Sequence, residues 1–229
     1  MNSKTISIAI DGFSSTGKST LAKQLANKLG YVYVDTGAMY RAVTYYALEN
    51  KFISDTHFNV NDLVLELHKI AITFVFNPSV GFAEVYLNGK NIEKEIRTMR
   101  ISSFVSKIAA VAEVRYLLVK QQQQIGENTN VVMDGRDIGT VVFPDAQLKL
   151  FMTASDAVRA QRRYDELVGR GDVVTYEEVL HNVRERDYID SHRENSPLVK
   201  ATDAIEIDNS TLTIDTQFEK ILNLVAERV

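Results

Sequence analysis

The chain has 229 residues, of which 45% are hydrophobic and 24% are charged, and its formal net charge is -4 at pH 7. This length is sufficient for one α/β domain with a sizeable core, the acidic balance argues against a broad nucleic-acid-binding surface, and the absence of cysteine excludes disulfides and cysteine-ligated zinc. No apolar run approaches the ~20 residues of a membrane span, and a polar stretch after Met1 leads directly into an expected strand, so we expect no signal peptide and a cytoplasmic location.

The first motif is a phosphate-binding loop that runs from Gly12 to Ser19 with the spacing G-x-x-x-x-G-K-S. Before it, isoleucines alternate with small or polar residues over 5–10, as in a strand, and after it leucines recur at helical spacing over 21–29. This strand-to-helix junction is the context that the motif requires, and it disfavours the alternative of a simple glycine-containing turn. Lys18 is then expected to reach the β- and γ-phosphates, and the Ser19 hydroxyl to ligate Mg²⁺.

A second strand is expected over 31–34, followed by a helix over 38–50. Asp35 or Thr36 is the expected N-cap of this helix. Arg41 would then lie near the first turn, where a cation is mildly unfavourable beside the helix dipole. Capping explains Asp35 and Thr36, whereas Arg41 hints at an anionic partner.

A small antiparallel region is expected to interrupt the α/β pattern. Residues 55–69 are expected to form a short polar-faced helix, and strands are expected over 70–76 and 84–87. Asn88-Gly89 is the strongest short-range hairpin signal in the chain, and a further strand over 90–92 would return from it. We interpret roughly residues 62–98 as an inserted subdomain.

The next apolar pattern predicts one long helix over 101–125, which would carry Ser106 and Arg115. Its buried face is expected to contain Phe104, Val105, Ile108, Ala109 and Ala112. The glutamine run over 121–124 is expected to be a solvated helix end.

The string Asp134-Gly135-Arg136-Asp137 directly follows a short apolar strand over 131–133. A carboxylate at the end of a buried strand, in a chain with a phosphate loop, is where an aspartate of the magnesium shell is expected. Open α/β sheets also bind ligands outside the carboxyl ends of their strands. An Asp-Gly turn without function stays open as an alternative, although two acids flanking an arginine make it less favourable.

Two arginine-bearing helices are expected after a strand over 147–152. The first, over 155–168, carries Arg159, Arg162 and Arg163 on one face, and Gly169-Arg170-Gly171 follows as a hinge or tip. This face is either solvated or part of a mobile arm that closes over phosphates. The second helix is expected over 176–190. If it continues, Arg186, Asp190 and Arg193 form one stripe, which a surface ion-pair ladder would also explain.

A last strand over 204–207 and a final helix complete the pattern, which predicts a parallel sheet with helices on both faces. The four histidines have no spaced partners that would suggest a metal cluster.

Several of these motifs together resemble bacterial cytidylate kinases. The phosphate loop, Glu95-Ile96-Arg97-Thr98 and Arg184-Glu185-Arg186-Asp187 fit that family in order and spacing over nearly the whole chain. The strings D-T-G-A-M-Y-R from Asp35 and D-G-R-D-I-G-T from Asp134 are far more specific, because adenylate, guanylate, thymidylate and shikimate kinases share the loop but not these strings. Phe13 stands where proline is common, and the loop ends in Lys-Ser-Thr where many members have Lys-Gly-Thr.

The resemblance implies an α/β P-loop nucleoside-monophosphate-kinase fold. Its single kinase domain would have a core over about 1–61, 99–153 and 197–229, the acceptor-binding insertion over about 62–98, and a helical lid over about 155–175. The implied activity is Mg²⁺-dependent transfer of the γ-phosphoryl of ATP to CMP or dCMP. The expected partners are these small molecules, with no nucleic acid and no membrane, and we expect a monomer.

The resemblance also implies roles for individual residues. The acceptor's monophosphate would be clamped by Arg41, Arg136 and Arg193, and its ribose would contact Arg186 and Asp190. The cytosine readers would be Thr36, Ser106, Arg115 and Asp137, with Tyr40 in the same site. The catalytic set would be Lys18, Arg136 and the lid arms Arg159, Arg162 and Arg163. ATP would be held by Gly12, Phe13, Ser14, Ser15, Thr16, Gly17, Lys18, Ser19 and Thr20. Mg²⁺ would be held by Ser19 and, through water, by Asp134.

Two other readings stay open at this point. The first is a P-loop kinase of another nucleotide or small metabolite. The second is a non-catalytic ATP-binding regulator. A GTPase switch is disfavoured because the guanine-reading string N-K-x-D is absent.

Overall fold

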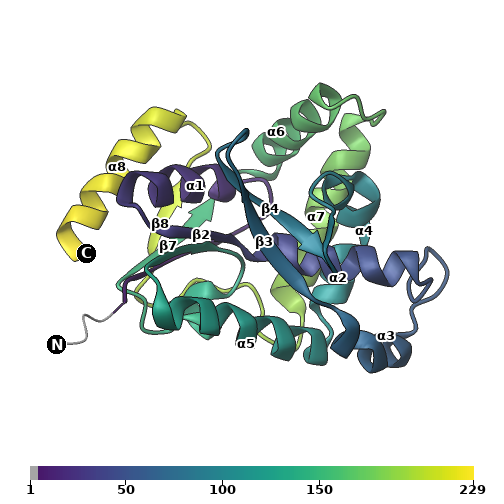
Figure 1. Ribbon diagram of the computed structural model, residues 1–229. Helices are drawn as coiled ribbons and strands as arrows, with labels where there is room; N and C mark the ends of the chain where they lie inside the picture. Colours follow the sequence, from purple (N-terminus) through teal and green to yellow (C-terminus); the bar gives the residue numbers. More distant parts are fainter. Residues whose placement is uncertain (1–4) are drawn as a thin grey trace. The chain divides into compact units, whose positions relative to one another are not determined.

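The computed structural model describes residues 5–229 (Figure 1). The chain divides into two compact units, one formed by the residues up to Asp35 together with Val119–Val229, and the other by Thr36–Leu118. Among the described residues, no helix combines the length and the apolar character needed to cross a membrane.

The first unit is built on a five-stranded sheet in the order β2-β6-β1-β7-β8, in which every neighbouring pair is parallel. The strands are β1 (Ser7–Gly12), β2 (Val32–Asp35), β6 (Val131–Asp134), β7 (Leu148–Thr153) and β8 (Ile205–Asp208). β1 and β6 are buried along their whole length, as expected for central strands covered on both faces. The predicted parallel sheet is therefore confirmed.

Helices flank this sheet on both faces, which confirms the predicted α/β class. α1 and α8 cover one face, and the C-terminal part of α5 runs along the other (Figure 1). A hydrophobic core forms between the sheet and helices α1 and α8. It contains Ile8, Leu25, Leu150 and Ile221. The helices are α1 (Lys18–Leu29), α5 (Ala112–Asn128, of which only the part from Val119 belongs to this unit), α6 (Asp156–Gly169), α7 (Tyr176–His192) and α8 (Ile214–Arg228).

The second unit contains the predicted antiparallel sheet, in the order β3-β4-β5. Its elements are α2 (Thr36–Glu49), α3 (Val60–Glu66), β3 (Ile72–Asn77), β4 (Phe82–Leu87), β5 (Lys90–Asn91) and α4 (Met99–Ala109), with 3-10 turns over Leu67–Lys69 and Glu95–Arg97. Asn88 and Gly89 connect β4 to β5 with φ angles of 50° and 80°. Positive φ at both central residues is what a tight two-residue hairpin requires, so the hairpin prediction is confirmed.

The prediction of one long helix over 101–125 is wrong, because α4 ends at Ala109 and α5 begins at Ala112. Arg115 Nη1 donates to the carbonyl oxygen of Ala109 at 3.2 Å, so its side chain satisfies one of the carbonyls that the end of α4 leaves without a helical partner. Ala112, predicted to be buried, is exposed at the start of the new helix.

Two further expectations about helices are also corrected. The helix expected from residue 55 begins at Val60, where the Asn59 side chain accepts the backbone N–H of Asp62 and caps it. The glutamine run over 121–124 is not a solvated helix end. α5 continues to Asn128, so the run lies inside the helix, and Gln122 faces inward with 1% of its surface exposed.

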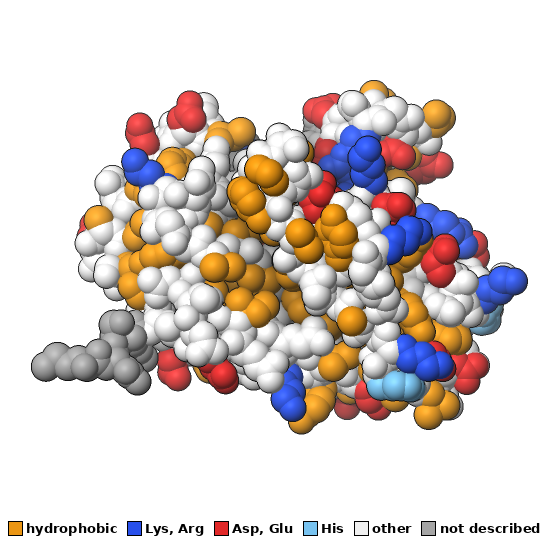
Figure 2. Space-filling view, in the orientation of Figure 1, with side chains coloured by type: hydrophobic (Ala, Val, Ile, Leu, Met, Phe, Trp, Pro, Cys, Tyr) orange, Lys and Arg blue, Asp and Glu red, His pale blue; other side chains and the backbone are white. Residues whose placement is uncertain are grey.

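The charged side chains do not gather by sign on the face shown in Figure 2, where basic and acidic groups are interspersed. This arrangement agrees with the small net charge of the chain.

Candidate functional site

The phosphate loop lies between β1 and α1, so its predicted structural context is confirmed. Gly12 (φ 138°) and Gly17 (φ 85°) adopt backbone angles that side chains disfavour. A Cβ atom on Gly12 would lie 2.0 Å from the carbonyl oxygen of Met152, so only glycine allows β1 and β7 to approach this closely. Ser14 and Thr16 are buried inside the loop.

The Lys18 side chain folds back over the loop and is buried. Its Nζ donates to the carbonyl oxygen of Phe13 and contacts Thr16 Oγ1 at 3.3 Å. Burial and the positive charge of Arg136 lower the pKa of Lys18 well below its usual value, while Asp134 and Asp11 oppose this shift. Negatively charged phosphate oxygens would favour the charged ammonium, so this position is suited to an anion.

Ser19 and Asp134 meet at the carboxyl end of β6. Ser19 Oγ donates to Asp134 Oδ2 at 2.8 Å, and Tyr33 Oη donates to Oδ1 at 2.9 Å. Burial and the neighbouring carboxylate of Asp35 raise the pKa of Asp134, and Lys18 opposes that rise. A nearby Mg²⁺ would also oppose it, and this pair offers the hard oxygen ligands that Mg²⁺ prefers.

The described residues contain no group of three or more histidine, cysteine or acidic side chains that could hold a metal ion. Mg²⁺ does not need such a group, because it is often bound by one or two protein oxygens together with substrate phosphates and water. The residues present therefore fit a magnesium ion that arrives with a nucleotide.

A cluster of arginines and aspartates forms in the same unit after β6 and along α7. Arg136 Nε donates to Asp190 Oδ2 at 2.8 Å. Arg193 Nη2 lies 3.6 Å from Asp137 Oδ1, and Arg193 Nη1 lies 4.0 Å from Asp190 Oδ1. Burial raises the pKa of Asp190, but Arg136, Arg186 and Arg193 outweigh it and hold that pKa below its usual value. The positive charges of Arg136 and Arg186 also reach Lys18, which joins this cluster to the phosphate loop.

The remaining acceptor-site predictions fall in the second unit. Thr36, Tyr40 and Arg41 lie on α2, Ser106 on α4 and Arg115 on α5. All of these except Arg41 are buried. The Arg115 guanidinium lies 5.5 Å from the centre of the Tyr40 ring, and α2 packs against α4, so the packing of this unit holds these side chains in place.

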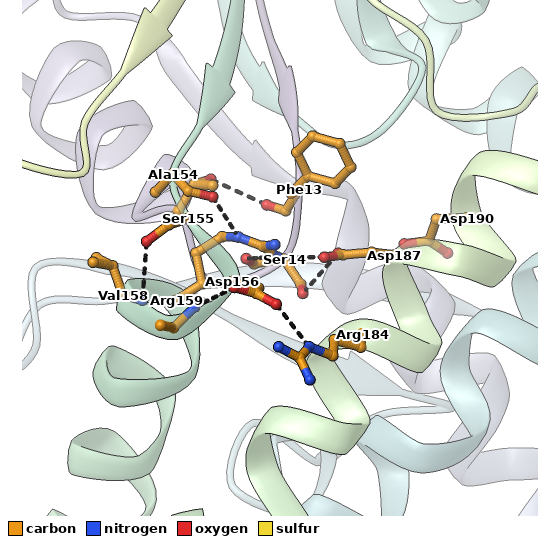
Figure 3. A network of polar contacts seen from close by, with 12 residues as sticks. Phe13, Ser14, Ala154, Ser155, Asp156, Val158, Arg159, Arg184, Asp187 and Asp190 are labelled. Atoms are coloured by element: carbon orange, nitrogen blue, oxygen red, sulfur yellow. Dashed lines mark hydrogen bonds and ion pairs between the residues drawn. The ribbon is translucent and has the colours of Figure 1, made fainter. Parts of the chain in front are cut away.

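The three arginines of α6 have different partners. Arg159 Nε donates to the carbonyl oxygen of Ala154 at 2.9 Å. Its Nη1 donates to the carbonyl oxygen of Ser14 at 3.3 Å and lies 2.6 Å from Asp187 Oδ2 (Figure 3). Arg162 binds the side chain and carbonyl oxygen of Asn209, and Arg163 pairs with Glu166 on its own helix. Arg159 thus contacts the phosphate loop directly, through the carbonyl oxygen of Ser14.

A sequence model of the cytidylate kinase family matches residues 8–227. The chain belongs to the cytidylate kinase family. A protein named cytidylate kinase from Flavobacterium psychrophilum is 64% identical over 222 residues, which is 97% of this chain and 98% of that protein. Another of the same name from Flavobacterium johnsoniae is 66% identical over 226 residues, covering 99% and 98%. The crystal structure of an uncharacterized protein from Eubacterium ventriosum shares the fold, with a TM-score of 0.52 at 14% identity over 98% of this chain and 100% of its own.

One buried acid of this cytidylate kinase family member escaped the sequence analysis. Asp11 ends the alternating strand pattern just before the loop. Its position beside Gly12 is the sequence feature that could have marked it as a site residue. Its two carboxylate oxygens accept the backbone N–H groups of Ile138 and Gly139 at 2.8 and 2.7 Å. These residues begin a π-helical turn, Ile138–Val142, directly after Asp137, so Asp11 ties the loop strand to the D-G-R-D segment.

Asn209 was also missed, although it lies just after the last strand, where polar side chains often serve a ligand site. Its Nδ2 donates to the carbonyl oxygen of Thr16 at 2.6 Å and to Gln217 Oε1 at 2.7 Å. Asn209 therefore supports the phosphate loop from the β8 side.

Asp11→Asn is expected to change how stability depends on pH in this kinase-family protein. Burial raises the pKa of Asp11 to about 6, against the two N–H groups that lower it. The folded protein therefore binds this proton more tightly than the unfolded chain, so the contribution of Asp11 to stability is fully present below about pH 4 and is lost as pH rises through about 6. The asparagine variant has no such titration.

Denaturant unfolding of both proteins at several pH values would test this. Relative to Asp11→Asn, the wild-type free energy of unfolding should fall by about 2 kcal/mol as pH rises from about 4.5 to about 7. A difference between the two proteins that is constant over this range would contradict the assignment.

Proposed function

We propose that the protein transfers the γ-phosphoryl group of ATP in line to CMP and dCMP, with magnesium, and so forms CDP and dCDP. The observation that supports this most strongly is the charge cluster that joins Lys18 to Arg136 and Arg186 in a member of the cytidylate kinase family. Phosphoryl transfer requires two anions held close together with their charge neutralised, and this cluster supplies fixed positive groups for that purpose.

On the donor side, the loop residues Gly12 to Thr20 would cradle the phosphates through their backbone N–H groups. Lys18 would neutralise the charge that develops on the β- and γ-phosphates, and Arg159, Arg162 and Arg163 would complete the site from α6. Mg²⁺, when bound, would screen the phosphate charge, held directly by Ser19 and through water by Asp134.

On the acceptor side, Arg41, Arg136 and Arg193 would clamp the monophosphate, and Arg186 and Asp190 would contact the ribose. Thr36, Ser106, Arg115 and Asp137 would read the cytosine edge, with Tyr40 beside them. Such discrimination is large because a wrong base leaves buried polar groups without a partner. In this proposal residues 62–98 form the acceptor-binding insertion, and residues 155–175 form a lid that excludes water.

We further propose that the protein works as a monomer in the cytoplasm on small-molecule substrates alone. Its net charge of -4 and the mixed charges on the face in Figure 2 favour this over a nucleic-acid-binding role.

An acceptor panel tests the activity. Purified protein, ATP and Mg²⁺ are combined in turn with CMP, dCMP, UMP, AMP and shikimate, and ADP release is followed in a coupled assay. CMP and dCMP should give the highest kcat/KM. A clear preference for UMP, AMP or shikimate would refute the assignment, and ATP binding without turnover on any acceptor would favour a regulatory protein.

A further inference from the structure

Helix α7 carries charged groups for two different purposes. Asp190 pairs with Arg136, which the proposed function places on the acceptor side. Three residues earlier, Asp187 turns its carboxylate to the phosphate loop and α6 (Figure 3). One oxygen lies 2.6 Å from Arg159 Nη1, and the other accepts a hydrogen bond from Ser14 Oγ at 3.4 Å.

The Asp187–Arg159 pair is largely withdrawn from water, with the arginine side chain 6% exposed and the aspartate side chain 15% exposed. Arg159 also bonds two backbone carbonyl oxygens, and its guanidinium lies 5.2 Å from the centre of the Phe13 ring. These neutral contacts orient the group, whereas Asp187 supplies a full opposite charge. Breaking such a pair leaves a buried charge uncompensated, so Arg159 would leave this position more readily.

We propose that Asp187 is a positioning residue, which holds Arg159 against the phosphate loop in readiness for the transferring phosphate. Because Asp187 follows Arg186 on α7, the same helix would set the donor-side arginine and the acceptor-side contacts together. This inference rests on the proposed function, since it assigns Arg159 to the phosphates of ATP.

The fold offers a matched control for the packing of the two helices. Arg184 on α7 pairs with Asp156 on α6 at 2.7 Å, and this pair is much more exposed, at 62% and 38% of the two side chains (Figure 3). Arg184→Ala therefore removes an ion pair between the same helices without touching the loop.

The experiment compares Asp187→Asn, Asp187→Glu and Arg184→Ala with the wild type by steady-state kinetics. Asp187→Asn should lower kcat by about tenfold while KM for CMP stays within about twofold, because the lost interaction matters most in the transition state. Asp187→Glu keeps the charge and should recover part of kcat. Arg184→Ala should leave kcat and both KM values within about twofold.

A double-mutant cycle with Arg159→Gln separates positioning from general support of the fold. If Asp187 acts through Arg159, Asp187→Asn should cost less than about twofold further in the Arg159→Gln background. An undiminished loss there, or a kcat for Asp187→Asn equal to that of Arg184→Ala, would overturn the proposal.

The affinity for ATP, measured by calorimetry, distinguishes this proposal from the proposed function. If the wild type binds ATP but does not phosphorylate CMP, the proposed function fails. The positioning role is then judged by whether Asp187→Asn, and not Arg184→Ala, weakens ATP binding by about threefold or more.

Discussion

Replacing Lys18 with alanine is expected to lower kcat for CMP phosphorylation by about a thousandfold while leaving the fold at least as stable as before. The loss in rate follows from removing the positive group that we propose neutralises the transferring phosphate, in a site that the proposed lid would shield from water. Burial lowers the pKa of this ammonium most, and the positive charges of Arg136 and Arg186 lower it further. Its charge therefore costs folding free energy in the ligand-free protein, and alanine removes that cost.

Two measurements on the Lys18 variants test whether the rate falls while the stability of the fold does not. Single-turnover kinetics should give the loss in rate, and denaturant unfolding without nucleotide should give an unchanged or increased free energy of unfolding. Lys18→Arg keeps a charge but changes its geometry, so we expect most of the kcat loss to persist. A rate loss below about tenfold, or stability that falls in parallel with rate, would contradict the assigned role.

Arg136→Ala is expected to lower kcat/KM for CMP by about a hundredfold or more and to leave ATP affinity nearly unchanged. The variant removes one arm of the proposed monophosphate clamp. It also removes the 2.8 Å partner of Asp190, whose side chain is 5% exposed. Stability should therefore fall by about 3 kcal/mol, the lower end of the usual range for a broken buried pair, because Arg186 and Arg193 still offset the charge of Asp190.

The double variant Arg136→Ala/Asp190→Asn separates these two effects. Neutralising Asp190 removes the uncompensated charge, so the free energy of unfolding should largely recover. The response to CMP should stay as poor as in Arg136→Ala. Recovery of activity together with stability would show that Arg136 serves the fold and not the acceptor.

The parts of the fold that follow from local chemistry could be predicted from the sequence. The phosphate loop lies where an alternating strand meets a helical repeat, and Gly12 and Gly17 have the backbone angles that the motif demands. The Asn88-Gly89 turn follows from the same stereochemistry. Strand alternation between helices was sufficient to predict the parallel sheet.

The remaining features depend on partners far away in the sequence. No glycine or proline marks the break between α4 and α5; there the Arg115 side chain reaches back to Ala109. Asp11 accepts hydrogen bonds from backbone N–H groups 127 and 128 residues later in the sequence. Arg159 donates a hydrogen bond to a loop carbonyl oxygen 145 residues earlier. Local patterns could therefore predict the strands, helices and turns that carry these side chains, but not the long-range contacts that orient them.

The most direct test of the central claim follows the phosphoryl group itself. ATP radiolabelled at its γ-phosphate is incubated with the protein, Mg²⁺ and equal concentrations of CMP, dCMP, UMP and AMP, and the products are separated. We predict that the label appears chiefly in CDP and dCDP. Label found mainly in inorganic phosphate, or in the diphosphate of another base, would contradict transfer from ATP to a cytosine nucleotide.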